Sequence, residues 1–131
     1  MKAKELDQFY TDPQVALELT RKTVDMAVDC LGYDASDLSF VEPSAGEGAF
    51  LDAANSCGYS ITGYDIDPQD ERVIYNDFLS TPISGVNRDS TVILGNPPFG
   101  KRARLALSFI NKAFDYVDTV AFIVPNTCER Y

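Results

Sequence analysis

Five short, nearly continuous apolar segments alternate with helical patterns along this 131-residue chain, and that alternation limits its fold more than any other feature. Such segments predict strands that are covered on both faces, as in a parallel sheet with helices packed against each side. We therefore expect an α/β fold, a three-layer sandwich around a mainly parallel sheet of about five strands. The predicted strands cover residues 38–41, 60–66, 72–75, 90–94 and 119–124.

Three helices are predicted between these strands. Asp12-Pro13 is typical of an N-cap followed by the first helical position, so we expect a helix over 13–31. A second helix is predicted over 49–57. The third, over 103–117, has the most regular pattern because apolar residues recur on one face. The apolar faces of the first and third helices contain Leu17, Val24, Val28 and Leu31, and Ala106, Phe109, Ile110, Ala113, Phe114 and Val117.

The size and charge of the chain limit its partners. We expect a single domain over 1–131, with 1–12 as an N-terminal arm. The formal net charge of −9 argues against non-specific binding of polyanions, which needs clustered lysine and arginine. The apolar runs are far shorter than the ~20 residues of a membrane span, so we expect no membrane partner. The charged N-terminus has no apolar core, so we expect no signal peptide.

Two residue counts exclude further classes of chemistry. The chain has no histidine, which excludes Ser-His-Asp triads, histidine bases and histidine metal sites, and we predict no bound metal. Cys30, Cys57 and Cys128 are odd in number and contain no Cys-x-x-Cys pair, so they indicate neither a zinc knuckle nor a disulfide framework. Three free, buried thiols fit a reducing compartment, and we expect a cytoplasmic protein.

Polar or glycine-rich segments follow four of the predicted strands directly. In parallel α/β sheets, ligands bind at the carboxyl ends of the strands. Because these ends lie at one edge, we expect the four segments to meet there and form the site. The segments are 42–48, 65–67, 76–79 and 95–100.

The first segment is a turn of small residues from a strand into a helix, where a ligand can approach backbone N–H groups. Gly46 and Gly48 form a Gly-x-Gly, but Leu51 stands where the dinucleotide fingerprint needs a third glycine or alanine. The phosphate-loop motif is absent too, so the turn suits a ligand with a carboxylate and no phosphate. By itself, the turn is equally consistent with a plain connection from strand to helix.

Acidic residues follow the next two strands. Asp65 lies about 20 residues beyond the glycines, where nucleotide-binding sheets hold ribose hydroxyls. A nucleoside with a carboxylate and no phosphate describes S-adenosylmethionine. After the third strand, Asp77 could accept a hydrogen bond from an adenine amino group, and Phe78 could cover the adenine face. Aspartate is also common in turns, so this pair is weak evidence alone.

The fourth segment contains Asn96-Pro97-Pro98-Phe99, the most specific motif in the chain. Its two prolines fix φ and remove two N–H donors, so the segment cannot continue a strand ladder. The Asn96 amide oxygen and the Pro97 carbonyl can accept both hydrogen bonds of a planar amino group, and Phe99 can stack on its ring. A plain proline turn is the alternative, since Asn-Pro is a common turn dipeptide. The position at the ligand edge favours a site.

Such a motif fits methylation of an exocyclic amine. The amine of adenine or cytosine is a poor nucleophile because its lone pair is conjugated with the ring. Two acceptors that draw its hydrogens out of the plane favour the tetrahedral nitrogen that attacks a sulfonium methyl. The proton can leave afterwards, so no histidine base is required. A base in a duplex must first be flipped out of the helix.

These motifs, in this chain order, resemble the class I S-adenosylmethionine-dependent methyltransferases, specifically the N6-adenine branch. The resemblance implies a Rossmann-like methyltransferase fold, S-adenosyl-L-methionine as cofactor, and methyl transfer to adenine N6 in DNA or, less favoured, RNA. Asn-Pro-Pro-Phe is specific for this branch, whereas the glycine turn is moderately specific. The matching segments are 9–11, 42–51, 63–68, 77–79 and 96–100.

The resemblance also implies roles for individual residues. Tyr10, Thr11 and the 44–48 turn would hold the methionine part of the cofactor. Asn96, Pro97 and Phe99 would hold the target base as the catalytic residues. The full set of implied cofactor-binding residues is Tyr10, Thr11, Glu42, Ser44, Ala45, Gly46, Gly48, Asp65, Ile66, Asp77 and Phe78.

The chain departs from the family pattern in two respects. It has Thr11-Asp12-Pro13 where the family usually has Thr-Pro. The family's sheet has seven strands, and this chain lacks strands six and seven and a target-recognition domain. We therefore expect either a truncated catalytic-domain fragment or a cover, from a partner or a second copy, over the apolar edge at 119–124.

Lys101, Arg102 and Arg104 follow the Asn-Pro-Pro-Phe motif, at a helix start where cations oppose the helix dipole. Residues placed against a local preference often serve function, which here would be contact with nucleic-acid phosphates. A solvated turn explains them equally well. With few other basic residues, tight binding of nucleic acid would need further chain or a partner.

Three functions remain open from the sequence. The first is methylation of adenine in DNA or RNA. The second is methylation of a glutamine side-chain amide in a protein, which the acidic charge suits, although those relatives usually carry tyrosine in place of Phe99. The third is a catalytically inactive, methyltransferase-like binding or regulatory subunit, which the early chain end favours.

Overall fold

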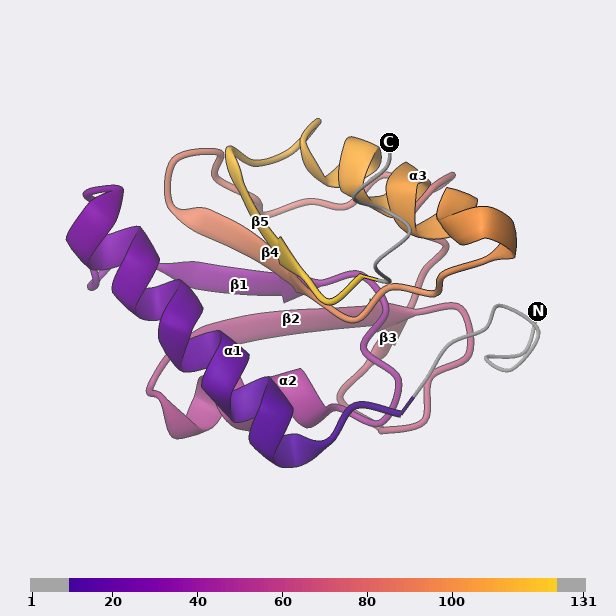
Figure 1. Ribbon diagram of the computed structural model, residues 1–131, viewed down its shortest axis with the longest axis horizontal. Helices are drawn as coiled ribbons and strands as arrows, with labels where there is room; N and C mark the ends of the chain where they lie inside the picture. Colours follow the sequence, from indigo (N-terminus) through magenta and orange to yellow (C-terminus); the bar gives the residue numbers. More distant parts are fainter. Residues whose placement is uncertain (1–9, 125–131) are drawn as a thin grey trace.

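The five predicted strands form one sheet in the computed structural model, which describes residues 10–124 (Figure 1). All neighbouring strands are parallel, and their order is β3-β2-β1-β4-β5, so the predicted parallel α/β fold is confirmed and the arrangement is Rossmann-like. Residues 1–9 of the predicted arm, and Cys128, lie outside the described residues. The strands are β1 (Ser39–Glu42), β2 (Ser60–Asp65), β3 (Ile74–Tyr75), β4 (Thr91–Gly95) and β5 (Thr119–Phe122).

The helices lie on both faces of this sheet (Figure 1). Alternate residues of the central strands point to opposite faces, because the side-chain period of a strand is two residues. Phe40 and Leu94 pack in the core beneath α1 and α2, whereas Val41 and Ile93 pack in the core beneath α3. The helices are α1 (Pro13–Asp25), α2 (Ala49–Ser56) and α3 (Arg104–Ala113), with a π-helical segment η2 (Met26–Cys30) and a 3-10 turn η3 (Lys101–Ala103).

The first helix begins as predicted and ends differently. The Asp12 carboxylate accepts hydrogen bonds from the N–H groups of Gln14 and Val15, at 2.8 and 3.3 Å, which confirms it as the N-cap. In η2 the wider π-helical turn changes the phase of the helix. Leu31, predicted on the apolar face, is therefore 52% exposed. The prediction of buried cysteines is also wrong for the described part of the chain, because Cys30 is exposed and Cys57 is half-buried.

The third helix is shorter than the predicted 103–117. Near its start, the N–H groups of Leu105 and Ala106 have no partner within the helix and donate instead to the carbonyl oxygen of Phe99, at 3.1 and 3.2 Å. It ends at Ala113, and the following turns still bury Val117 in the core. The predicted apolar face is therefore buried along most of its length, although it does not belong to one continuous helix. Phe114, which was predicted on this face, is exposed because the helix has already ended at Ala113.

β5 forms one edge of the sheet, since it pairs with β4 and no other described strand. All four of its residues are half-buried, so the apolar edge predicted at 119–124 is present in its first four residues. What covers it remains a prediction. Among residues 10–124, none of the helices has the length and apolar character needed to cross a bilayer.

Candidate functional site

Two adjoining cavities open at the carboxyl ends of β1, β2 and β4, and Ser44 lies in the wall of both. The first, here called the Glu42 cavity, has a volume of about 150 Å³. The second, here called the Phe78 cavity, has a volume of about 230 Å³. The Glu42 cavity is lined by Tyr10, Thr11, Glu42, Ser44, Ala45, Gly46, Glu47, Ala49, Phe50, Gln69 and Asn96. The Phe78 cavity is lined by Pro43, Ser44, Asp65, Ile66, Asn76, Asp77, Phe78, Leu79, Pro98, Leu105 and Phe109.

The turn between β1 and α2 is held in shape by a buried carboxylate. One oxygen of Asp65, Oδ2, accepts a hydrogen bond from the Gly46 N–H at 2.8 Å, and the other accepts one from the Asp67 N–H at 2.8 Å. Asp65 thus lies at the predicted place, at the end of β2, but both of its oxygens already bind backbone. Its first role is to order the glycine turn against β2, which the sequence did not predict.

Leu51 fits at the third position of the fingerprint because of a glycine on the neighbouring strand. A Cβ atom at Gly63 would lie 2.7 Å from Leu51 Cδ1 and 2.8 Å from Ala45 Cβ, closer than side chains can approach. The missing side chain at Gly63 makes room for a leucine where dinucleotide folds need glycine or alanine.

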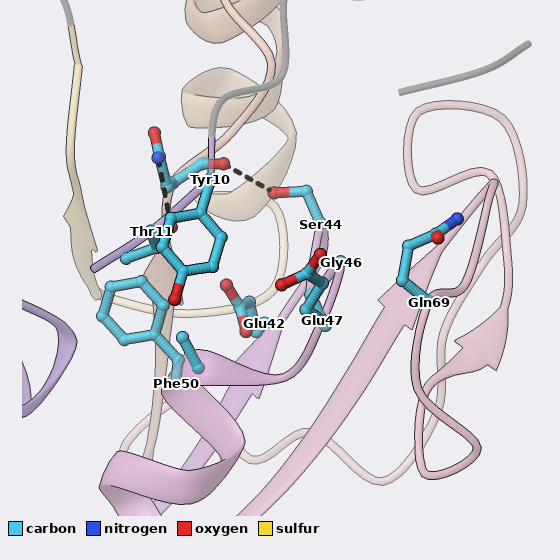
Figure 2. Close-up of a pocket in the computed structure, with 11 residues that line it drawn as sticks. Tyr10, Thr11, Glu42, Ser44, Gly46, Glu47, Phe50 and Gln69 are labelled. Atoms are coloured by element: carbon cyan, nitrogen blue, oxygen red, sulfur yellow. Dashed lines mark hydrogen bonds between the residues drawn. The ribbon is translucent and has the colours of Figure 1, made fainter. Parts of the chain in front are cut away.

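Glu42, the last residue of β1, is 2% exposed and points into the cavity named after it (Figure 2). Its Oε1 atom is buried and has no hydrogen-bond partner among the described residues. Burial, and then the negative charge of Asp65, raise the pKa of this carboxyl well above its usual value of 4.5. Gly95 allows this placement, because a Cβ there would lie 2.8 Å from Glu42 Cγ.

The Asn-Pro-Pro-Phe segment is packed into the same wall. The Asn96 amide nitrogen donates to Thr11 Oγ1 at 3.2 Å, and the Asn96 carbonyl accepts from Ser44 Oγ at 3.2 Å (dashed lines in Figure 2). Asn96 is 8% exposed, and both prolines are fully buried, whereas Phe99 is half-buried. The segment therefore joins the start of the described chain to the glycine turn.

The residues after β3 divide between core and surface. Phe78 is fully buried and stacks on Phe109, with ring centroids 5.4 Å apart, so it lines the cavity as part of the core. Asp77 is exposed, and its Oδ1 accepts from the N–H of Leu79 at 3.3 Å. Asn76 begins the segment 76–79 that was expected at the site, but it was given no role of its own. It lines the same cavity, and its Oδ1 is buried without a partner among the described residues.

The basic residues that follow the motif lie outside both cavities. Lys101, Arg102 and Arg104 are exposed, and none of them forms an ion pair within the described part of the chain. Arg102 and Ala103 both have left-handed backbone conformations, with φ of 55° and 60°. Such conformations cost non-glycine residues roughly 1–2 kcal/mol each. By contrast, Arg72 is paired with Asp52 and Asp70.

Most of the predicted site residues therefore come together. Of the cofactor set, all but Gly48 line one of the two cavities, and of the base-binding set, Asn96 lines the Glu42 cavity while Pro97 and Phe99 line neither. Gly48 instead begins α2 with a φ of +91°, and a side chain there would meet the Arg72 guanidinium. Comparison of the sequence with protein-family models and with curated proteins finds no match.

Proposed function

We propose that this chain binds S-adenosylmethionine across the two cavities and transfers its methyl group to the N6 amino group of an adenine in DNA or RNA. The observation that carries the proposal is the junction of the cavities at Ser44. The Glu42 cavity holds the buried Glu42 carboxyl beside a glycine turn. The Phe78 cavity has mainly apolar walls, and its buried carboxyl, Asp65, accepts hydrogen bonds from backbone with both oxygens. A ligand with a charged amino-acid end and an aromatic nucleoside end matches this division.

The methionine end belongs in the Glu42 cavity. Its ammonium group can bind the Glu42 carboxyl, and its carboxylate can accept from backbone N–H groups at the turn into α2. The adenosine end belongs in the Phe78 cavity, where Phe78 and Leu105 supply apolar contacts and the Asn76 amide supplies a polar one. Asp65 supports both ends, because it holds the turn between them.

The transfer step needs a target amine beside Asn96. The amine nitrogen uses its lone pair to form a bond to the methyl carbon, the carbon–sulfur bond breaks, and its electron pair stays on sulfur. The product nitrogen then loses a proton to water. We expect the Asn96 amide nitrogen to keep its contact with Thr11 while the amide oxygen accepts from the target amine, so that the Thr11 contact orients this oxygen.

Lys101, Arg102 and Arg104 support a nucleic-acid acceptor. They are exposed and outside ion pairs within the described chain, although the chain as a whole has a net charge of −9. A local group of cations beside the proposed base site can neutralise phosphates that flank a flipped base. Since three cations neutralise few phosphates, we expect weak, salt-sensitive binding.

Titration calorimetry with S-adenosylmethionine, and with ATP and NAD as controls, tests the cofactor. We expect saturable binding of S-adenosylmethionine alone, and no binding by the folded chain would overturn the proposal. Transfer of a labelled methyl group to duplex DNA, single-stranded DNA, RNA and a glutamine-containing protein then tests the acceptor. Transfer to glutamine would favour the protein acceptor, and binding without transfer to any acceptor would favour a cofactor-binding subunit.

A further inference from the structure

Glu42 is a buried ionisable residue whose carboxyl lacks both a salt bridge and a full set of hydrogen bonds within the described chain. The side chain is 2% exposed, Oε1 has no hydrogen-bond partner among residues 10–124, and no salt bridge of this part of the chain includes it. A buried carboxylate without a cation or hydrogen bonds is costly, and such groups usually bind a proton instead. Burial without a partner cation therefore favours the protonated, neutral form of Glu42 in the free protein.

Among residues 10–124, the surroundings of Glu42 supply negative charge and no positive charge. Asp65 at the end of β2 is buried nearby, and its charge raises the pKa of Glu42 in addition to the effect of burial. Glu47 from the glycine turn and Tyr10 from the segment before α1 are the other titratable groups that line the cavity. β4 presents the uncharged Gly95 and Asn96, and no lysine or arginine of the described chain lines this cavity.

We propose that Glu42 is a proton-linked cation site: its carboxyl is neutral in the free protein and releases its proton when the positively charged amino-acid end of the cofactor enters the cavity. The inference rests on the proposed function for the identity of the cation. The exchange balances, because one proton leaves the carboxyl as one ammonium group arrives. In the free protein the Glu42 carboxyl carries the proton. In the complex the carboxylate is neutralised by the ammonium group, and the proton has passed to the solvent.

The exchange has a consequence for selectivity. A ligand that brings an ammonium group ionises Glu42 and gains a charge-assisted contact, whereas a nucleoside without that group leaves the carboxyl neutral. The cavity thereby distinguishes S-adenosylmethionine from a fragment such as 5′-methylthioadenosine, which lacks the amino acid. It also makes cofactor affinity depend on pH, with up to tenfold tighter binding for each unit that the pH rises below the pKa of the free carboxyl.

The protonation state of Glu42 can be measured without any ligand. We would follow the side-chain carboxyl ¹³C signals of the glutamates by NMR as the pH is raised, and assign Glu42 by its loss in Glu42→Gln. The Glu42 signal should titrate well above pH 4.5. Glu18→Gln, a change at an exposed glutamate outside both cavities, is the control for the assignment. Titration of Glu42 near pH 4.5 would overturn the inference whatever the protein binds.

The coupling is then measured by calorimetry at pH 6, in two buffers that differ in ionisation enthalpy. We expect S-adenosylmethionine to release a proton from the wild-type chain and from Glu18→Gln, a change at an exposed residue outside both cavities, and none from Glu42→Gln. The dissociation constant should rise by about tenfold or more in Glu42→Gln, as for loss of a hydrogen bond to a charged group. 5′-Methylthioadenosine should release no proton and bind both variants equally.

The two failures are distinguishable. Cofactor binding without proton release, or equal release from Glu42→Gln, would overturn the inference and leave the proposed function standing. Absence of cofactor binding by a chain whose Glu42 is neutral would overturn the proposed function, and with it the assignment of the cation.

Discussion

Gly95 lies where any side chain would meet the buried acid. Its φ is +148°, and a Cβ atom would lie 2.8 Å from Glu42 Cγ and 2.9 Å from Oε2. The absence of a side chain at Gly95, on β4, therefore makes room for the Glu42 side chain at the end of β1. Two neighbouring strands thus depend on each other at one point, and the position of the carboxyl follows from the absence of a side chain on β4.

We expect Gly95→Ala to lower the free energy of unfolding by about 1–3 kcal/mol, the usual cost of overpacking. Urea unfolding measures this change. Gly85→Ala is the matched control, because Gly85 also has a positive φ, +75°, but has no atom within 4 Å of the added carbon. Equal losses in the two variants would show that backbone strain, and not contact with Glu42, limits position 95.

Asn96 has a separate prediction, which depends on the proposed function. Replacing it with alanine removes the amide that would hold the target amine, and also its contact with Thr11. We expect methyl transfer by Asn96→Ala to fall below detection while cofactor affinity stays within a few-fold. Labelled methyl transfer and calorimetry measure the two quantities. Thr11→Val removes the same contact but keeps the amide, so at saturating cofactor it should transfer faster than Asn96→Ala, even if it binds the cofactor more weakly. Loss of both quantities in Asn96→Ala would make Asn96 structural.

Among the helices and strands, α3 is bounded by contacts from elsewhere in the chain. The guanidinium of Arg88 donates to the carbonyl oxygens of Phe114, Asp115 and Val117, at 3.3, 2.6 and 3.2 Å. It also pairs with Asp118 at 3.1 Å. Carbonyls at a helix end lack partners within the helix, and a cation there also interacts favourably with the helix dipole. Arg88 thus stabilises the turns that follow α3.

Replacing Arg88 with alanine should lower the free energy of unfolding by roughly 1–2 kcal/mol, because several carbonyl contacts are lost at a half-exposed site. Amide hydrogen exchange should become faster near residue 114. Lys112→Ala is the control. It breaks the partly exposed ion pair with Asp115, at 3.8 Å, and the contact of Lys112 Nζ with the Tyr116 ring, 5.8 Å from its centroid, and should cost less than about 1 kcal/mol. Similar losses in both variants would contradict the capping role.

For the whole molecule, the buried Glu42 predicts how stability depends on pH. The pKa of Glu42 is raised in the folded chain, so between its usual 4.5 and the raised value the folded state binds the proton more tightly than the unfolded state. Stability should therefore fall as the pH rises through this window. The pKa of Asp70 has the opposite shift, to about 2, because Arg72 donates hydrogen bonds to it. The stabilisation of the folded chain by ionised Asp70 is lost only as the pH falls from about 4 towards 2.

We expect the difference in unfolding free energy between Glu42→Gln and the wild-type chain to increase from pH 4.5 towards neutral pH, in favour of the variant. Glutamine keeps the shape and cannot ionise, whereas the wild-type carboxyl must lose its stabilising proton. Urea unfolding of both chains from pH 4 to 8 gives the difference, in which the Asp70 contribution and the general repulsion of a −9 chain largely cancel. Parallel curves would contradict a neutral Glu42.

Local sequence patterns alone account for the strands, their alternation with helices, the N-cap at Asp12, and the edge at which polar segments gather. These features depend on neighbouring residues: apolar period, turn chemistry and capping are encoded within a few positions of one another. The positions of the glycine turn and the Asn-Pro-Pro-Phe segment at the site therefore follow from the order of the residues.

The hydrogen bonds and the burial of the site residues depend on contacts between segments that are far apart in the sequence. Thr11 meets Asn96 across 85 positions, and Asp65 meets Gly46 across 19, so neither contact is encoded in local spacing. The exposure of Leu31 and the early end of α3 also depend on packing, through the π-helical phase change and the contacts of Arg88. The burial of Glu42 is the clearest case, because a carboxyl becomes costly only when the fold surrounds it, and no lysine or arginine of the described chain lines its cavity.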